Sequence, residues 1–282
     1  MNSILELRKE YEPRLAPVAR SDFSRALLDA AFDNLEVGGA LRFNNFSYVL
    51  REFVRHILNE SAPSDEVKAC VWFKPHKNSK SGVTRTHRAK FSIQGGLSDQ
   101  FVEKKLGIDS REALKGLVAA QDTLSKYTHI EPSTFNIAVE ESQKLAEECL
   151  TAAAAYVELI LDCRQSVRNA VADHIDHHLI SEIVGNGIDE LYEIATHGWV
   201  DGHWVDQILV KDISSKSVSL AIEGSMDFGL QYGSSGDVKR DMGVVTSDSF
   251  PFTAAILVQM KAPLGKYASV ERLEVDTDSF YV

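Results

Sequence analysis

The spacing of apolar residues predicts helices in the first two thirds of the chain. Over residues 21–35 and 43–58 apolar side chains recur every three or four positions, as on one face of a helix. Ser21 is a suitable N-cap for the first of these helices. Residues 110–127 are helical in pattern as well. Neither proline nor glycine interrupts residues 136–184, so we expect one long helix there, or two joined at a kink.

Two short apolar segments between these helices predict a β-hairpin. Residues 67–73 and 89–93 are rich in β-branched and aromatic side chains, and the polar stretch KPHKNSKSGVTRTHR separates them. Such segments flanking a polar stretch are typical of paired strands. We therefore expect a hairpin with a long loop over residues 67–98.

After Gly185 the pattern changes to alternation with period two, which is typical of strands. We expect a short helix over 189–195, and then the strands 204–210, 217–222, 226–232, 253–260 and a short 272–275. Polar turns separate these strands, so an antiparallel meander is expected. The predicted fold class is α+β. An α-helical domain, residues 1–185, carries the inserted β-hairpin, and a β-rich antiparallel accessory domain follows over 186–282.

The net charge of −11 is unevenly distributed. Residues 1–134 hold 20 basic and 17 acidic side chains, and residues 135–282 hold 10 and 24. Residues 67–98 contain seven basic side chains and no acidic one, with aromatic residues beside them. Cations and aromatic rings together can bind a phosphate backbone and stack on bases. The alternative is a solvated segment whose aromatic residues face the core.

We therefore predict that nucleic acid, RNA or DNA, binds through basic side chains of the first domain. The predicted ligands are Lys74, Lys77, Arg85, His87, Arg88, Lys90 and Lys126.

One candidate catalytic group lies in the predicted helix 43–58, which contains Arg51, Arg55 and His56. A metal-independent ribonuclease needs a histidine to move protons and an arginine to stabilise the phosphorane charge. Arg55 lies one turn beyond Arg51, whereas His56 projects about 140° away from Arg51 on the helix. The alternative is that these are surface and inter-helix residues.

A second candidate is His129, which together with Lys126 closes a predicted helix just before Pro132. The helix dipole favours a cationic histidine in the last turn, so His129 is a candidate catalytic acid or phosphate ligand. The alternative is a C-terminal cap.

Metal ligands are expected to be absent. His174 and His178 are spaced i,i+4, but the H-E-x-x-H arrangement is missing and an apolar stripe runs beside them. Mg²⁺ would be needed only if the C-terminal carboxylates were catalytic, and solvated turns explain these more simply. The carboxylates in question are Glu223, Asp227, Asp237, Asp241 and Asp248. The three cysteines form no CxxC pair, which disfavours a disulfide framework. GxxxxGK[ST], GxGxxG and GxSxG motifs do not occur.

Several blocks of the sequence resemble a known family when taken together. The blocks are RFNNFSYVLREFVRHIL, VKACVWFKP, GVTRTHRAKFSIQGGLSDQFV, LSKYTHIEP, GSMDFGLQYGSSGDVKRDMG and SDSFPFTAAI. They resemble the bacterial predicted pPIWI-associating nucleases, a resemblance that implies a nuclease role in defence against phage and plasmids. The helical half also resembles HEPN-type ribonucleases, whose R-x4-6-H signature Arg51 and His56 match.

These observations lead to two functional hypotheses. The first is a defence nuclease that acts on or binds nucleic acid through its basic N-terminal domain. The alternative is a non-catalytic adaptor that binds nucleic acid by residues 67–98 and a partner protein of the same defence system by the acidic domain. The long helix 136–184 is a candidate homodimer interface. The first residues are charged where a signal peptide would be apolar, so we expect a cytoplasmic protein with no membrane association.

Overall fold

The structure is a computed structural model that describes residues 4–77, 79–186, 188 and 193–281. Its chain divides into two compact units, Met1–Arg164 (unit 1) and Gln165–Val282 (unit 2). The division falls inside one long helix, α8 (Val139–Asn186), so the first part of α8 belongs to unit 1 and the remainder to unit 2. The domain boundary at residue 185 stays a prediction.

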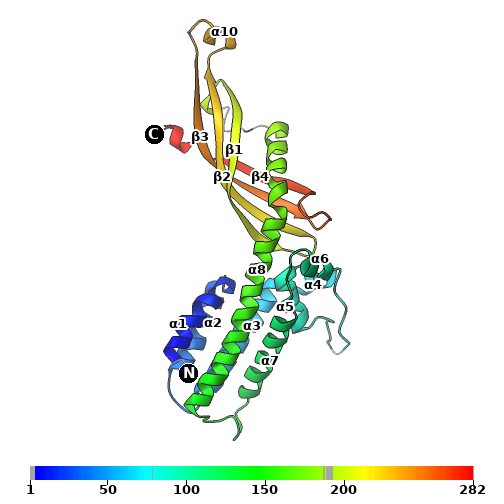
Figure 1. Ribbon diagram of the computed structural model, residues 1–282. Coiled ribbons are helices and arrows are strands. Elements are labelled where there is room, and N and C mark those ends of the chain that lie inside the picture. The colour runs from blue at the N-terminus through cyan, green and yellow to red at the C-terminus, as the bar shows by residue number, and fades with distance from the viewer. Residues whose placement is uncertain (1–3, 78, 187, 189–192, 282) are drawn as a thin grey trace. The chain divides into compact units, whose positions relative to one another are not determined.

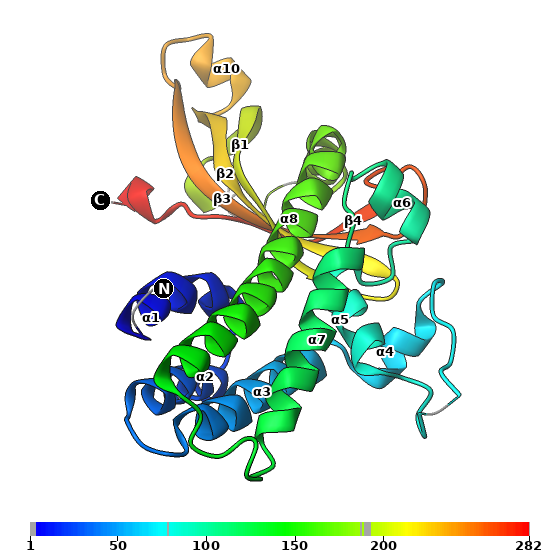
Figure 2. The same cartoon turned by 60° about the horizontal axis from the view of Figure 1, so that its bottom comes forward.

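Unit 1 is built from helices (Figure 1). Besides the first part of α8 they are α1 (Ile4–Leu15), η1 (Ala16–Val18), α2 (Asp22–Glu36), α3 (Arg42–Ser61), α4 (Ser64–Ala69), α5 (Arg85–Gln94), α6 (Asp99–Lys104) and α7 (Arg111–Tyr127). Helix α3 packs on α2, α5 and α7. Figure 2 shows α7 alongside the first part of α8, where the Cβ position at Gly116 is 3.7 Å from Cβ of Ala152. The helices predicted over 21–35, 43–58 and 110–127 are confirmed, and α8 is a single helix.

Aromatic side chains fill the core between α2, α3 and α7. Phe32, Phe46 and Phe53 are at most 2% exposed, and the rings of Phe43 and Tyr127 meet edge to face with centroids 4.8 Å apart. Burying such rings contributes on the order of 1.5–3 kcal/mol each. This core holds the end of α7 against α3, which determines where the candidate site residues lie.

The predicted β-hairpin over 67–98 is wrong, because the structure has α4, a loop and α5 there. A capping box starts α5: Thr84 Oγ1 accepts from the His87 N–H, and His87 Nδ1 accepts from the Thr84 N–H. Ala89 and Ile93 lie one helical turn apart and are both buried. A short apolar segment fits a strand or a buried helix equally well, and here the capping box favours the helix.

Unit 2 contains a four-stranded antiparallel sheet with strand order β1-β2-β3-β4 (Figure 1). The strands are β1 (His197–Ile213), β2 (Ser217–Tyr232), β3 (Val244–Gln259) and β4 (Ala268–Val275), and the short helices are α10 (Ser235–Val238) and η2 (Asp278–Tyr281). The antiparallel meander is confirmed. The separate strands 217–222 and 226–232 form one strand, because Gly224 continues the alternation of buried side chains. Residues 189–192 of the predicted short helix lie outside the described residues.

The second part of α8 buries an apolar stripe inside unit 2. Val171, Ile175 and Leu179 are at most 1% exposed. His178 Nε2 lies 2.8 Å from the carbonyl oxygen of Gly265 in the β3–β4 connection, and His174 packs against the same glycine. Within the described residues, no helix is both long enough and apolar enough to cross a bilayer.

Candidate nucleic-acid interface

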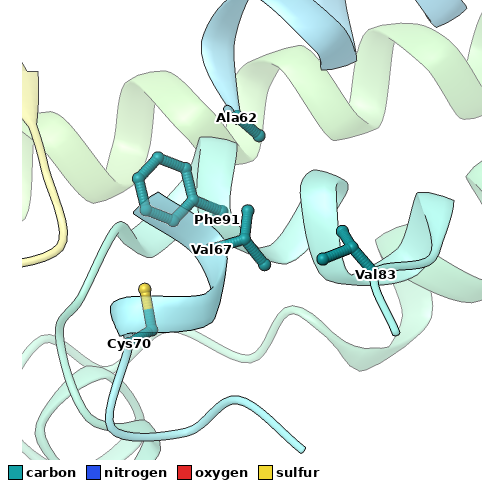
Figure 3. Packing of buried hydrophobic residues seen from close by; sticks show 5 residues of the cluster. All are labelled: Ala62, Val67, Cys70, Val83 and Phe91. Atoms are coloured by element: carbon teal, nitrogen blue, oxygen red, sulfur yellow. The ribbon is translucent and has the colours of Figure 1, made fainter. Parts of the chain in front are cut away.

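A small apolar cluster anchors both ends of the basic segment 67–98. Figure 3 shows the cluster, which consists of Ala62, Val67, Cys70, Val83 and Phe91. These residues come from the end of α3, from α4 and the residue that follows it, from the residues before α5, and from α5 itself. The loop between α4 and α5 therefore starts and ends on a fixed base.

The two aromatic residues at the start of this loop pack against the cluster. Trp72 Nε1 donates to the carbonyl oxygen of Gly95 at 2.8 Å, and the ring of Phe73 meets that of His87 edge to face at 5.1 Å. Both rings therefore pack against the protein, as in the alternative in which the aromatic residues of this segment face the core.

Two of the predicted phosphate ligands hold the local fold together. The guanidinium of Arg88 donates to the carbonyl oxygen of Ala62 and, at 2.8 Å, to Ser64 Oγ, so it ties α5 to the α3–α4 connection. Lys90 Nζ lies 2.7 Å from a carboxylate oxygen of Asp99 and 4.6 Å from the ring centroid of Trp72. Arg88 and Lys90 already have these acceptors, so either side chain would have to give up its contacts to bind a phosphate.

Lys68 on α4 lies 3.8 Å from a carboxylate oxygen of Asp65, and the four remaining cations of the segment face solvent. Lys74, Lys77, Lys80 and Arg85 are exposed, and we call them the loop cations. Across the ranges that the structure describes, none of them forms an ion pair with a carboxylate. The predicted ligands do not include Lys80. Lys80 lies in the same acid-free stretch of the sequence, and that stretch is the signal that indicates it. The loop cations are the part of the segment available to an anion.

His87 has a structural role that affects its charge. It is half-buried and its Nδ1 accepts the N-cap hydrogen bond of α5. Burial lowers the pKa of His87, and its neighbours His76 and Lys90 lower it further. The ring is therefore neutral at pH 7 and adds no charge to the loop cations.

On α3, one carboxylate joins two of the predicted catalytic residues. The two oxygens of Glu52 accept from Arg51 Nη2 at 3.1 Å and from Arg55 Nε at 2.7 Å. Partial burial would raise the pKa of Glu52, but the hydrogen bonds from Arg55 and Arg51 outweigh burial and lower it. The carboxylate is thus ionised at neutral pH and offsets one of the two positive charges.

Arg51 also connects α3 to the end of α7. Its Nη1 donates to Thr128 Oγ1 at 3.0 Å. Thr128 lies between Lys126 and His129, and both of these side chains are exposed. The contact therefore joins Arg51 to a residue that is next to Lys126 and His129 in the chain, and Arg51 shares the carboxylate of Glu52 with Arg55. We call Arg51, Arg55, Lys126 and His129 the α3–α7 cluster.

His56 contacts a different helix. Its Nε2 lies 3.0 Å from Glu60 Oε1, and its ring meets that of Phe23 on α2 edge to face at 4.9 Å. Because the positions are about 140° apart on the helix, Arg51 contacts the end of α7 while His56 contacts α2. The sequence spacing alone did not show that the two residues have different neighbours.

Two family models, both described as predicted pPIWI-associating nuclease, match residues 18–153 and 160–281. The chain belongs to this family. The matched segments cover both units, and the interval between them lies inside α8. No curated protein and no solved structure matches the chain. Membership is consistent with a nuclease-like protein of bacterial defence.

In this predicted pPIWI-associating nuclease, the candidate metal ligands of unit 2 do not form a cluster. The described residues include no group of three histidine, cysteine, aspartate or glutamate side chains that could hold a metal ion. Asp237 accepts from the Ser234 N–H and so caps α10, while Glu223 and Asp227 lie on β2 and Asp248 lies on β3. The carboxylates therefore do not form a site for Mg²⁺ within this part of the chain.

Proposed function

We propose that this protein is a nuclease of bacterial defence whose helical unit binds the nucleic-acid backbone through the loop cations. The proposal rests on the exposure of Lys74, Lys77 and Lys80 on a loop with fixed ends and of Arg85 at the first residue of α5. Cations crowded on one loop repel one another, and a bound polyanion relieves that repulsion while releasing its counterions. RNA and DNA both supply such a backbone.

The α3–α7 cluster is the proposed place of chemistry. Arg51 and Arg55 would stabilise the negative charge that develops on phosphorus-bound oxygens in the transition state. The exposed imidazole of His129 would transfer the proton of the attacking or leaving hydroxyl group, and Lys126 would hold the neighbouring phosphate. The Arg51–Thr128 hydrogen bond supports this assignment, because it fixes Arg51 at the end of α7, where Lys126 and His129 lie.

The second candidate function is a non-catalytic adaptor, and the position of Glu52 favours it. With one carboxylate accepting from both Arg51 and Arg55, these arginines are partly neutralised in the free protein. An adaptor would bind nucleic acid through the loop cations and a partner protein through acidic unit 2. For cleavage, Arg51 and Arg55 must exchange their contacts with Glu52 for contacts with a phosphate. An adaptor does not need this exchange.

Incubation of the full chain with labelled RNA and DNA in EDTA tests the proposed chemistry. We expect cleavage by the wild type and a loss of about 10²–10⁴-fold in rate in His129→Ala, as for removal of a general acid or base. Arg51→Gln should lower the rate comparably through lost charge stabilisation.

His56→Ala is the matched control, because its ring contacts α2 and Glu60 rather than the α3–α7 cluster. It should retain cleavage if the protein folds as the wild type does by circular dichroism. Loss of cleavage in His56→Ala with full activity in His129→Ala would overturn the assignment. Salt-sensitive binding with no cleavage under any metal condition would support the adaptor.

A further inference from the structure

Unit 1 contains a cavity that lies outside the proposed site. It has a volume of about 270 Å³ and lies between the residues around the start of α2, the end of α3, α5 and the first part of α8. Val18, Ile57 and Ile160 supply an apolar wall. The volume is just below the ~300 Å³ at which small-ligand pockets usually begin. The cavity is therefore suited to a ligand of about one nucleotide and not to a strand.

Two guanidinium groups line the same cavity. Arg20 precedes α2 and Arg164 lies on α8, and both are among the lining residues. Within the described part of the chain, Arg20 forms no ion pair with a carboxylate. The single acidic residue of the lining, Glu60, lies against His56 Nε2. The cavity thus combines an excess of positive charge with an apolar wall.

The hydroxyl groups of the lining add an acceptor to this cationic pocket. Ser61 Oγ donates to the carbonyl oxygen of Ile57 at 2.7 Å and lies 2.6 Å from Ser92 Oγ, which in turn lies 3.0 Å from the carbonyl oxygen of Arg88. The two hydroxyl groups have one proton each for these three contacts, so one hydroxyl donates to the other and the second donates to a carbonyl oxygen. Ser61 Oγ keeps a lone pair that can accept a hydrogen bond from a ligand.

We propose that this cavity binds the phosphate monoester of a single nucleotide. Arg20 and Arg164 would bind the phosphate, the apolar wall would contact the base or sugar, and Ser61 Oγ would accept from a hydroxyl or amino group of the ligand. A charged head, an apolar face and a donor occur together in a nucleotide. The monoester belongs either to a free nucleoside monophosphate or to the phosphorylated end of a strand. Binding at this cavity does not depend on cleavage at the α3–α7 cluster.

Calorimetric titration of the full chain with AMP tests the proposal, with adenosine and inorganic phosphate as comparison ligands. We expect AMP to bind and each comparison ligand to bind at least about tenfold more weakly, because each lacks one part of the recognised group. Arg20→Gln should weaken AMP binding about tenfold or more, since a charge-assisted hydrogen bond to phosphate is lost. The Arg20 side chain is exposed, so this variant should fold.

Arg111→Gln is the matched control, because it removes an exposed guanidinium of unit 1 that pairs with Asp109 away from the cavity. It should leave AMP binding unchanged. Titration with 5′-phosphorylated, 3′-phosphorylated and unphosphorylated trinucleotides identifies whether a free nucleotide or a strand end binds better. Absence of AMP binding at millimolar concentration, equal binding of inorganic phosphate, or unchanged AMP binding in Arg20→Gln would each overturn the proposal.

Discussion

At the scale of single residues, basic side chains close together in sequence have different roles. Arg88 and Lys90 bind Ala62, Ser64 and Asp99, whereas the loop cations face solvent. The sequence shows that all of them are basic and that no acidic residue lies among them. It does not show which of them have partners, because those partners are 9 to 26 residues away and are brought near by the packing of α3, α4 and α5.

Asn44 is a residue on which the position of the α3–α7 cluster depends. Its side-chain amide is buried and donates to the carbonyl oxygens of Tyr127 at 2.8 Å and Thr134 at 3.1 Å. Asn44→Ala leaves both carbonyls buried without this donor, so we expect the free energy of unfolding to fall by about 1–3 kcal/mol in urea titration. Asn45→Ala, at an exposed position of the same helix, should change it by less than about 0.5 kcal/mol. Equal effects of the two variants would contradict this role.

The three cysteines should be inert in the folded protein. Burial raises the pKa of Cys70, Cys149 and Cys163 to about 12, so the thiols stay protonated at neutral pH. A chromogenic disulfide reagent should label none of them at pH 8 and all of them in urea. Because the folded-state pKa values are raised, the thiols' contribution to stability is complete below about pH 8.5 and declines as pH rises toward 12. Rapid labelling of the folded protein would contradict the burial of the thiols.

At the scale of elements, long periodic segments were predictable and short ones were not. The helices over 21–35, 43–58 and 110–127 have several turns of consistent spacing, and their apolar faces are buried in the core of unit 1. The segments 67–73 and 89–93 are too short to distinguish strand from helix by period. The Thr84–His87 cap starts the helix that contains the second segment, but these two residues lie where the sequence predicts a loop.

Two glycines of β2 differ in what a side chain would meet. A Cβ at Gly224 would overlap the backbone oxygen of Trp204 and the ring of Phe252. At Gly229 the three atoms nearest to a Cβ all belong to the ring of Trp199, which is 42% exposed and can move. We expect Gly224→Ala to destabilise the protein by about 1–3 kcal/mol or more in thermal or urea unfolding, as for overpacking. Gly229→Ala should lower the free energy of unfolding by less. It should also change the tryptophan fluorescence, because the Trp199 ring must move. A larger loss of stability in Gly229→Ala would contradict the packing of β2.

At the scale of the whole molecule, the acidic net charge and the proposed binding of nucleic acid are compatible. The excess of acidic residues lies in 135–282, and the loop cations lie in an acid-free stretch of unit 1. An overall count of charges therefore says little about which surface meets a polyanion. The family models match both units, so both are parts of the same kind of protein.

The salt dependence of nucleic-acid binding tests the central proposal most directly. Fluorescence anisotropy of labelled single-stranded RNA and DNA, measured from 50 to 300 mM KCl, would compare the wild type with the combined Lys74→Ala, Lys77→Ala, Lys80→Ala and Arg85→Ala variant. The charge-matched control replaces Lys9, Lys104, Lys105 and Lys115, which are exposed elsewhere in unit 1, by alanine. We predict that removing the loop cations weakens binding at least tenfold and makes the negative slope of log K against log salt concentration less steep by about 3. The control should behave as the wild type, and equal affinity and slope in the loop variant and the wild type would contradict the account.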